Sequence, residues 1–176
     1  MRYKKLSPRL MAMAGFVSSG ESIADIGADH GYLPLYLVRE GISPFAILTD
    51  IKPGPLEKTR ESVGKALDCF VAILSLRLGD GLAPIEKAEV DVVVIAGLGG
   101  ETIISILAED AEKAKSFGKY ILQPRTKTDL LKYWLKEAGW TIAAETKAEE
   151  YGRLCDIIVC APGAKKTSEI AQDFSF

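Results

Sequence analysis

Short apolar segments rich in β-branched residues alternate with amphipathic segments along most of the chain. This alternation is typical of strand–helix–strand units stacked on a parallel sheet. It predicts strands over residues 22–26, 45–49, 71–78, 91–96 and 120–122. It predicts helices over residues 7–17, 32–39, 55–67 and 126–138, and one more that starts after residues 99–100 and runs through residue 107. Residues 91–96 are almost continuously aliphatic, which predicts a strand buried on both faces at the centre of the sheet.

The last two predicted strands, residues 140–145 and 154–160, have no helical pattern between them. Residues 146–153 form a short polar segment, as a hairpin connection requires, so these two strands must pair antiparallel. The sequence therefore predicts an α/β, Rossmann-like fold: a mostly parallel sheet of seven strands with a C-terminal antiparallel hairpin and helices on both faces. Residues 1–161 are expected to form one domain, and residues 162–176 a short polar tail.

Composition and charge exclude several classes of protein. Hydrophobic residues make up 48% and charged residues 26% of the chain, which excludes a disordered, collagen-like or coiled-coil protein. The net charge of −2 does not indicate a nucleic-acid binder, so any polyanion must be held by a local basic patch. No apolar run is long enough to span a bilayer, and residues 1–9 lack the apolar core of a signal peptide. We therefore expect a soluble, cytoplasmic protein.

The cysteines and the single histidine favour neither a disulfide framework nor a metal centre. Cys69, Cys155 and Cys160 are odd in number and have no C-x-x-C spacing, which is typical of reduced core thiols. His30 alone cannot supply a multi-histidine cluster. No metal is expected.

In open parallel sheets the ligand crevice lies beyond the carboxyl ends of the strands, so the residues that follow each predicted strand are the candidates for binding. The first such segment runs from Asp25 to Tyr32. Its glycines, Gly27 and Gly31, lack the G-x-G-x-x-G spacing, which disfavours a pyrophosphate cofactor. Backbone amides at the start of the next helix could still receive a carboxylate. The alternative is that both glycines serve turn geometry alone.

Two more carboxylates follow the next two predicted strands. Asp50 could accept both hydroxyls of an adenosine ribose, and Asp80 could accept from an adenine amine; each alone is more often a turn residue or a helix cap. Together with Asp25 they favour S-adenosylmethionine over other ligands. The expected cofactor contacts are Asp25, Gly27, Gly31, Asp50, Ile51, Gly79, Asp80, Gly81, Ala96 and Gly97.

Five motifs in this order carry a resemblance to a known family: Leu-Ser-Pro-Arg-Leu at 6–10, Asp-Ile-Gly-Ala-Asp-His-Gly-Tyr-Leu-Pro at 25–34, Gly-Asp-Gly-Leu at 79–82, Ala-Gly-Leu-Gly-Gly at 96–100 and Leu-Gln-Pro at 122–124. Over residues 1–161 the chain resembles the bacterial tRNA (adenine-N1)-methyltransferases that modify adenine 22. Asp29 stands where the wider class I methyltransferase superfamily has the middle glycine of D-x-G-x-G-x-G. The resemblance implies methyl transfer from S-adenosylmethionine to N1 of that adenine. Family members commonly carry a C-terminal helical extension, of which residues 162–176 could be the start.

The segment after the fourth predicted strand bears on which atom is methylated. Methylation of the exocyclic adenine nitrogen typically uses an Asn/Asp-Pro-Pro-Tyr loop, whereas residues 96–100 offer no side-chain acceptor. Carbon methylation of pyrimidines usually needs a cysteine nucleophile at a strand exit, and none of the cysteines is placed there. Ring nitrogen N1 carries a free in-plane lone pair, so its methylation needs no prior deprotonation.

Three residues of the first loop are candidates for catalysis. The Asp29 carboxylate could stabilise the positive charge that arrives on the base, or it could cap the following helix. His30 could order the loop or touch the base, or be a plain hydrogen-bonding residue. Tyr32 could stack on the base, or serve packing.

Contacts with RNA are expected from a basic cluster and from the resemblance. Arg2, Lys4, Lys5 and Arg9 could grip phosphates, with Arg125 and Lys127 extending the patch, although a solvated basic terminus is the alternative. The glycine-rich segment 97–100 could let a base approach the backbone, or serve tight helix–sheet packing. The expected substrate contacts are Arg9, Leu98, Gly99, Gly100, Gln123, Pro124 and Arg125. Methylation of another RNA or of a small molecule, and a binding module without transfer activity, are the rival functions.

Overall fold

A computed structural model describes residues 5–28, 30–64 and 73–163. The first half of the chain contains α1 (Pro8–Ala14), β1 (Ile23–Ile26), α2 (Tyr32–Arg39), β2 (Ala46–Asp50), α3 (Pro53–Gly64) and β3 (Leu74–Leu78). The second half contains β4 (Val92–Leu98), α4 (Gly100–Glu109), α5 (Ala111–Ala114), β5 (Lys119–Pro124), α6 (Thr128–Glu137), β6 (Trp140–Glu150) and β7 (Arg153–Pro162).

The strands form one seven-stranded sheet in the order β3-β2-β1-β4-β5-β7-β6. The pairs from β3 to β5 are parallel, and β7 is antiparallel to both β5 and β6. The predicted α/β class, the mostly parallel sheet and the antiparallel end are therefore confirmed. The parallel strands bring the carboxyl ends of β1 to β5 to the same edge of the sheet.

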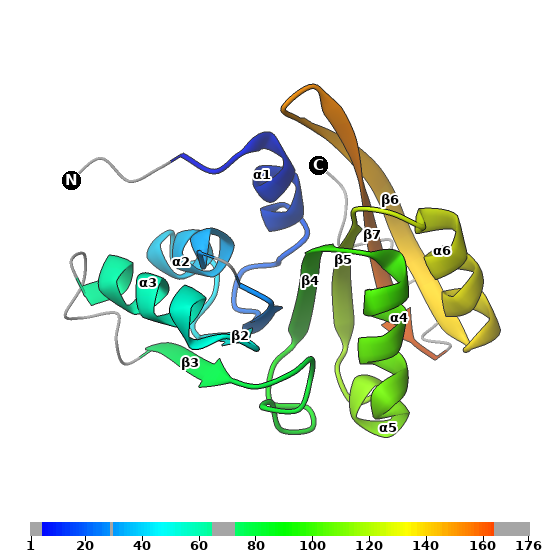
Figure 1. The fold of residues 1–176 in the computed structure, drawn as a ribbon, viewed down its shortest axis with the longest axis horizontal. Helices are drawn as coiled ribbons and strands as arrows, with labels where there is room; N and C mark the ends of the chain where they lie inside the picture. Colours follow the sequence, from blue (N-terminus) through cyan, green and yellow to red (C-terminus); the bar gives the residue numbers. More distant parts are fainter. Residues whose placement is uncertain (1–4, 29, 65–72, 164–176) are drawn as a thin grey trace.

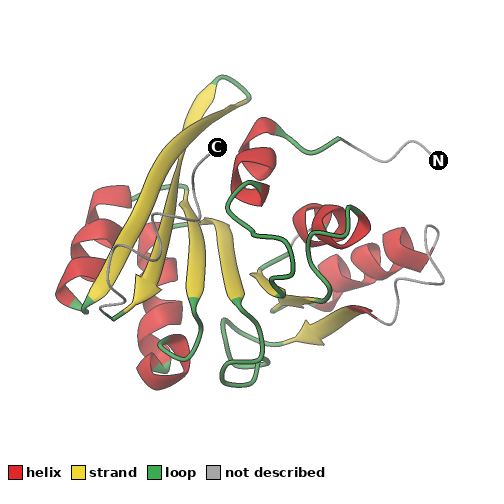
Figure 2. Cartoon of the chain, turned by 180° about the vertical axis from the view of Figure 1, so that it is seen from behind, coloured by secondary structure: helices red, strands yellow, loops and turns green. Residues whose placement is uncertain are grey.

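Helices cover both faces of the sheet (Figures 1 and 2). On one face α1 and α2 bury Met13, Leu33 and Leu37 against the strands. On the other face α4 and α6 bury their apolar sides, through Ile103, Leu107, Leu131 and Leu135. Side chains of successive strand residues point to opposite faces, so β1 contributes Ile23 to the first core and Ala24 to the second. Residues 92–95 of β4 are fully buried between these layers, as their aliphatic run predicts.

The antiparallel hairpin is longer than the sequence indicates. Residues 146–150 and 153 were expected to be connection, yet they are paired strand, and only Tyr151 and Gly152 form the turn. A hairpin tip needs no fully apolar face: within 146–150 only Ala148 is buried, and the ladder hydrogen bonds satisfy the backbone. The hairpin therefore projects beyond the sheet, beside α1 (Figure 1).

Smaller differences concern the ends of elements. β5 continues through Gln123 and Pro124, which were expected to end it; Pro124 is tolerated because it is the last residue of the strand, where the β4–β5 register shifts. α3 begins at Pro53 rather than Pro55, and α5 was not predicted. The predicted last residues of α3, 65–67, and the predicted first residues of the third strand, 71–72, lie outside the described residues.

Candidate functional site

A large cavity lies at the carboxyl ends of β1, β4 and β5, between α1 and the tip of the β6–β7 hairpin. Its volume is about 1410 Å³. This exceeds the 300–1,000 Å³ typical of sites for one drug-sized ligand, so the cavity has room for a cofactor and part of a second substrate. Of the expected site residues it brings together His30, Tyr32, Asp25, Gly27, Gly31, Ala96, Gly97, Arg9, Leu98, Gln123, Pro124 and Arg125.

Asp25 is the one carboxylate that β1, β4 and β5 contribute to the cavity lining. It is the third residue of β1, and its side chain is on the face covered by α1 and α2. Burial raises the pKa of Asp25 to about 7, an effect that the positive charge of Arg9 opposes. Near neutral pH this carboxyl therefore gains or loses a proton readily and would be stabilised as an anion by a cationic ligand.

The two glycines of the loop after β1 have different roles: Gly27 borders the cavity, and Gly31 allows close packing. Gly27 has a φ of +72° and open space where a Cβ would stand, so it borders the cavity. The amides of Gly27 and Ala28 both donate to the carbonyl of Thr49, at 2.9 and 3.0 Å, and so are already used within the sheet edge. A ligand carboxylate would therefore have to accept hydrogen bonds from backbone amides later in this loop, closer to the start of α2.

Gly31 is required by packing as well as by its backbone. It occupies the N-cap position of α2 with a φ of +61°. A Cβ there would stand 2.5 Å from Cδ2 of Leu48 and 2.9 Å from Cγ2 of Thr59. The neighbouring His30 and Tyr32 rings lie 5.2 Å apart and both line the cavity. Asp29, the third catalytic candidate, lies outside the described residues.

The second and third strand exits adjoin the first without lining the cavity. Asp50 ends β2 beside the β1 exit, and its carboxylate accepts from the amide of Lys52 at 2.8 Å. The amide of Gly79 donates to the carbonyl of Asp50, which joins the β2 and β3 exits. The five expected cofactor contacts outside the cavity lining are Asp50, Ile51, Gly79, Asp80 and Gly81. The three acids thus stand at neighbouring strand ends, with Asp25 alone facing the cavity.

The glycine-rich exit of β4 combines both of its expected roles. Gly97 has a φ of +75° and open space at its Cβ position, next to the cavity. Gly100 is buried, and a Cβ there would stand 2.6 Å from the carbonyl oxygen of Lys127 and 2.8 Å from that of Thr126. Neither Gly99 nor Gly100 lines the cavity. Close packing therefore explains Gly100, whereas Gly97 leaves the backbone open to a ligand.

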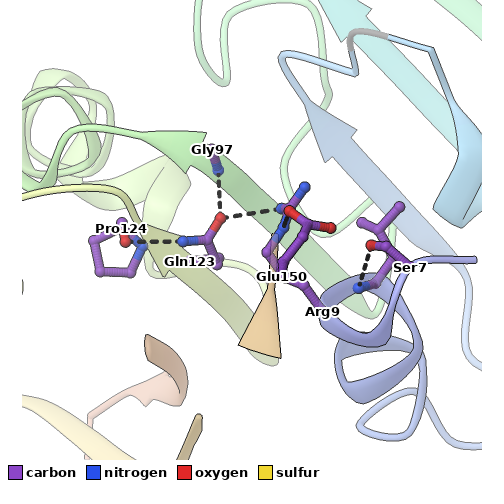
Figure 3. A network of polar contacts seen from close by, with 7 residues as sticks. Ser7, Arg9, Gly97, Gln123, Pro124 and Glu150 are labelled. Carbon is purple, nitrogen blue, oxygen red and sulfur yellow. Dashed lines mark hydrogen bonds and ion pairs between the residues drawn. The ribbon is translucent and has the colours of Figure 1, made fainter. Parts of the chain in front are cut away.

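A network of polar side chains ties α1 to the hairpin and to β5 (Figure 3). The Arg9 guanidinium donates to Glu150 at 2.6 Å and to Oε1 of Gln123 at 3.0 Å. The same Gln123 oxygen accepts from the amide of Gly97, and its Nε2 donates to the carbonyl of Pro124. Burial opposes the ionisation of Glu150, yet hydrogen bonds from Ser7 and Arg9 and the charges of Arg9 and Arg125 lower its pKa. We call Arg9, Gln123 and Glu150 the clasp.

The clasp changes the expectation for the basic patch. The charge of Arg9 is paired within the protein, so this residue positions the walls of the cavity rather than offering a free cation to a phosphate. Lys5 and Arg125 are exposed and line the cavity, and Lys127 is exposed outside it. Arg2 and Lys4 lie outside the described residues.

Sequence reasoning missed the wall that the hairpin supplies. Its tip lines the cavity through Glu149, Glu150, Tyr151, Arg153, Leu154, Cys155 and Asp156. Cys155 was expected as a core thiol within the last strand, whereas it is half-buried at the cavity wall. The available signal was Gly152, because glycine suits the second position of a two-residue hairpin turn with long flanking strands.

The ion pair of the clasp is expected to contribute measurably to stability. The Arg9 and Glu150 side chains are only 19% and 16% exposed, so water screens the pair weakly. Urea unfolding of Arg9→Ala, Glu150→Ala and the double variant should yield a coupling free energy of about 1 kcal/mol or more. The control pair, Lys87 and Glu112, is largely exposed and should show coupling close to zero. Additive losses for Arg9 and Glu150 would show that the clasp does not act as a unit.

No helix in the described ranges is long and apolar enough to cross a membrane. Comparison with known proteins gives three consistent results. Residues 6–158 match the family model described as a methyltransferase domain. The chain is 35% identical over 163 residues to the tRNA (adenine(22)-N(1))-methyltransferase of Bacillus subtilis (strain 168), covering 93% of this chain and 68% of that protein.

Solved structures agree. The crystal structure of Bacillus subtilis TrmK has a TM-score of 0.83 and 35% identity, covering 90% of this chain and 67% of that one. The crystal structure of Streptococcus pneumoniae Sp1610 in complex with S-adenosyl-L-methionine has a TM-score of 0.84 and 35% identity, covering 98% of this chain and 80% of that one. With both sequence and arrangement of elements shared over nearly its whole length, the chain belongs to the tRNA (adenine(22)-N(1))-methyltransferase family.

Proposed function

We propose that this protein transfers the methyl group of S-adenosylmethionine to N1 of adenine 22 in tRNA. The observation that carries the proposal is the match, over 93% of the chain, to an enzyme named for that reaction. The cavity supports it, because its volume suits a cofactor together with a nucleotide. We assign the activity to residues 1–161 as one methyltransferase domain, and place the protein in the cytoplasm, where tRNA is modified.

The cofactor would lie along the exits of β1 to β4. S-adenosylmethionine carries positive charge at its sulfonium and its ammonium group, and Asp25 faces the cavity as a carboxyl that such charge would ionise. Gly27 and Gly97 border the same cavity with no side chain to obstruct the ligand. At the neighbouring exits, Asp50 would accept hydrogen bonds from the ribose hydroxyls and Asp80 from the adenine amine. The remaining expected contacts with the cofactor are Gly31, Ile51, Gly79, Gly81 and Ala96.

The arrangement suits a ring nitrogen as the acceptor. The in-plane lone pair of N1 attacks the methyl carbon, the carbon–sulfur bond breaks, and its electron pair stays on the sulfur. The product base is then positively charged. We assign to Asp29 the stabilisation of that charge, and to His30 and Tyr32 contacts with the base, since both rings line the cavity beside the Asp25 exit.

On the substrate side, Leu98, Gln123, Pro124 and Arg125 line the cavity next to the cofactor region. Arg125 is exposed and can meet a phosphate. Arg9 would act through Gln123 and Glu150, as a positioning residue. Gly99 and Gly100 would contribute by the close packing of α4 that fixes this exit.

The direct test is methylation of defined transcripts. The protein would be incubated with methyl-labelled S-adenosylmethionine and an unmodified bacterial tRNA transcript, and the nucleosides of the digest would be analysed by mass spectrometry. We expect 1-methyladenosine, and no incorporation into the matched transcript with guanine at position 22. Label in a different nucleoside would point to another RNA site. Cofactor binding without incorporation would favour a binding module and contradict the proposal.

A further inference from the structure

The tip of the β6–β7 hairpin carries an aromatic side chain that the fold itself does not explain. Tyr151 is 92% exposed, more than any other large hydrophobic residue in the described ranges. Its backbone φ is +51°, and that of Gly152 is +73°. Two successive positive φ angles define the turn type in which asparagine or glycine is unstrained. A tyrosine at this position costs stability and buries almost nothing in return.

The tip stands at the mouth of the cavity rather than on a remote surface. Tyr151, Arg153 and Leu154 line the cavity together with the β1, β4 and β5 exits, and Leu154 is 69% exposed. Figures 1 and 2 show the hairpin projecting past the sheet on the side of α1. A large substrate that binds in the cavity can therefore contact this tip.

The position of the tip is fixed. The β6–β7 ladder continues to its last pair, Glu150 with Arg153. The clasp then anchors Glu150 to α1 and, through Arg9, to Gln123 of β5. An aromatic ring on such a support is presented to a ligand with little loss of backbone entropy on binding.

The charges around the mouth indicate the chemistry of the ligand. Lys5, Arg125 and Arg153 are exposed cations of the cavity lining, against the exposed carboxylate of Glu149. The charge of Glu150 is paired with Arg9. Exposed aromatic rings flanked by cations are how proteins hold unstacked nucleotides: the base stacks on the ring, and the phosphate meets the cation.

We propose that Tyr151 stacks on an unpaired base of the RNA substrate at the cavity mouth, and that Arg153 and Arg125 hold the flanking phosphates. This inference rests on tRNA being the substrate, as proposed above. It assigns to the hairpin tip the role of an RNA-binding wall, opposite the cofactor side of the cavity.

Two substitutions of Tyr151 separate stacking from structure. Asparagine removes the ring and suits the positive φ, so Tyr151→Asn should raise the melting temperature. The same variant should weaken the Kd for a fluorescent tRNA transcript about tenfold or more, the effect of losing one base–aromatic stack. Tyr151→Phe keeps the ring and should bind within about twofold of wild type. Tyr133→Asn, a 64% exposed tyrosine on α6 outside the cavity, is the matched control and should leave the Kd unchanged.

Binding and methylation are measured separately, with S-adenosylmethionine affinity expected to be the same in all variants. Wild-type affinity for tRNA in Tyr151→Asn would overturn the inference while the proposed reaction stands. Loss of binding in Tyr151→Asn by a protein that never methylates tRNA would support the RNA contact and overturn the reaction. A wild-type protein that neither binds nor methylates tRNA would overturn both.

Discussion

Replacing Asp25 with asparagine is expected to weaken S-adenosylmethionine binding about 10- to 100-fold at about pH 8, the loss typical of a hydrogen bond to a charged group. Asp25 lines the cavity, and the neutral amide of asparagine cannot balance the positive charge of the cofactor. Isothermal titration calorimetry on both proteins would measure the difference. Equal affinities would remove Asp25 from the cofactor site.

The same carboxyl should make cofactor binding depend on pH. Burial raises the pKa of Asp25 to about 7, which Arg9 counteracts only in part. A cationic ligand favours the carboxylate, so binding below pH 7 must release a proton. The affinity of the wild type is therefore expected to fall about tenfold per unit below pH 7 and to level off above it. Asp25→Asn should show no such slope, and a wild type with constant affinity down to about pH 5 would contradict this assignment of the pKa.

The stability of the two proteins provides the control against misfolding. Because the folded pKa of Asp25 is raised, its contribution to stability is fully present below the unfolded value near 3.8 and is lost as the pH rises through 7. Asp25→Asn should thus become more stable than wild type as pH rises, by about 2 kcal/mol at about pH 8, which is less than the full pKa shift implies because Asp25 is only half-buried beside the cavity. Weaker binding by a more stable variant would locate the loss at the site.

Gly100→Ala is expected to destabilise the fold by about 3 kcal/mol, the upper part of the range for inserting a methyl group into a packed region. The added Cβ would stand 2.6 and 2.8 Å from two backbone carbonyl oxygens, which cannot rotate away as a side chain can. It would also strain the hydrogen bond from the Gly100 amide to the Thr126 carbonyl. Urea unfolding followed by circular dichroism would measure the loss.

Gly118→Ala is the matched control for this substitution. Gly118 is exposed just before β5, and the atom nearest to an added Cβ would be the carbonyl oxygen of Asp91 at 3.6 Å, so alanine there should change the stability by less than about 0.5 kcal/mol. If Gly100→Ala lowered the free energy of unfolding by less than about 1 kcal/mol, the backbone at residues 126–127 would be able to move aside for the methyl group. Close packing would then not explain the glycine at position 100.

The parallel half of the molecule could be predicted because its signals are local. The aliphatic run of β4 and the helix–strand alternation of residues 23–64 reflect burial of side chains at a fixed period, which a single segment displays. Asp25, Asp50 and Asp80 could be grouped for the same reason, since parallel strands bring their carboxyl ends to one edge whatever the details of packing.

The hairpin tip and the clasp could not be predicted in this way. Residues 146–150 are strand because they pair with residues 153–157, and polar tips of this kind lack an apolar period. From the sequence alone Arg9 is expected to be a free cation, because its partners Gln123 and Glu150 are more than 100 residues away along the chain. Only the folded chain shows that its charge is already paired.

The sequence by itself determined the α/β architecture, the order of the strand exits along the chain and the resemblance to adenine-N1 methyltransferases, because each is a series of short patterns, and every pattern can be recognised within its own segment. The tertiary structure decided that Asp25 alone of the three acids faces the cavity, that Gly100 serves packing, and that Tyr151 stands at the cavity mouth. These depend on distances between segments remote in the chain, and hydrophobic periodicity carries no information about such distances.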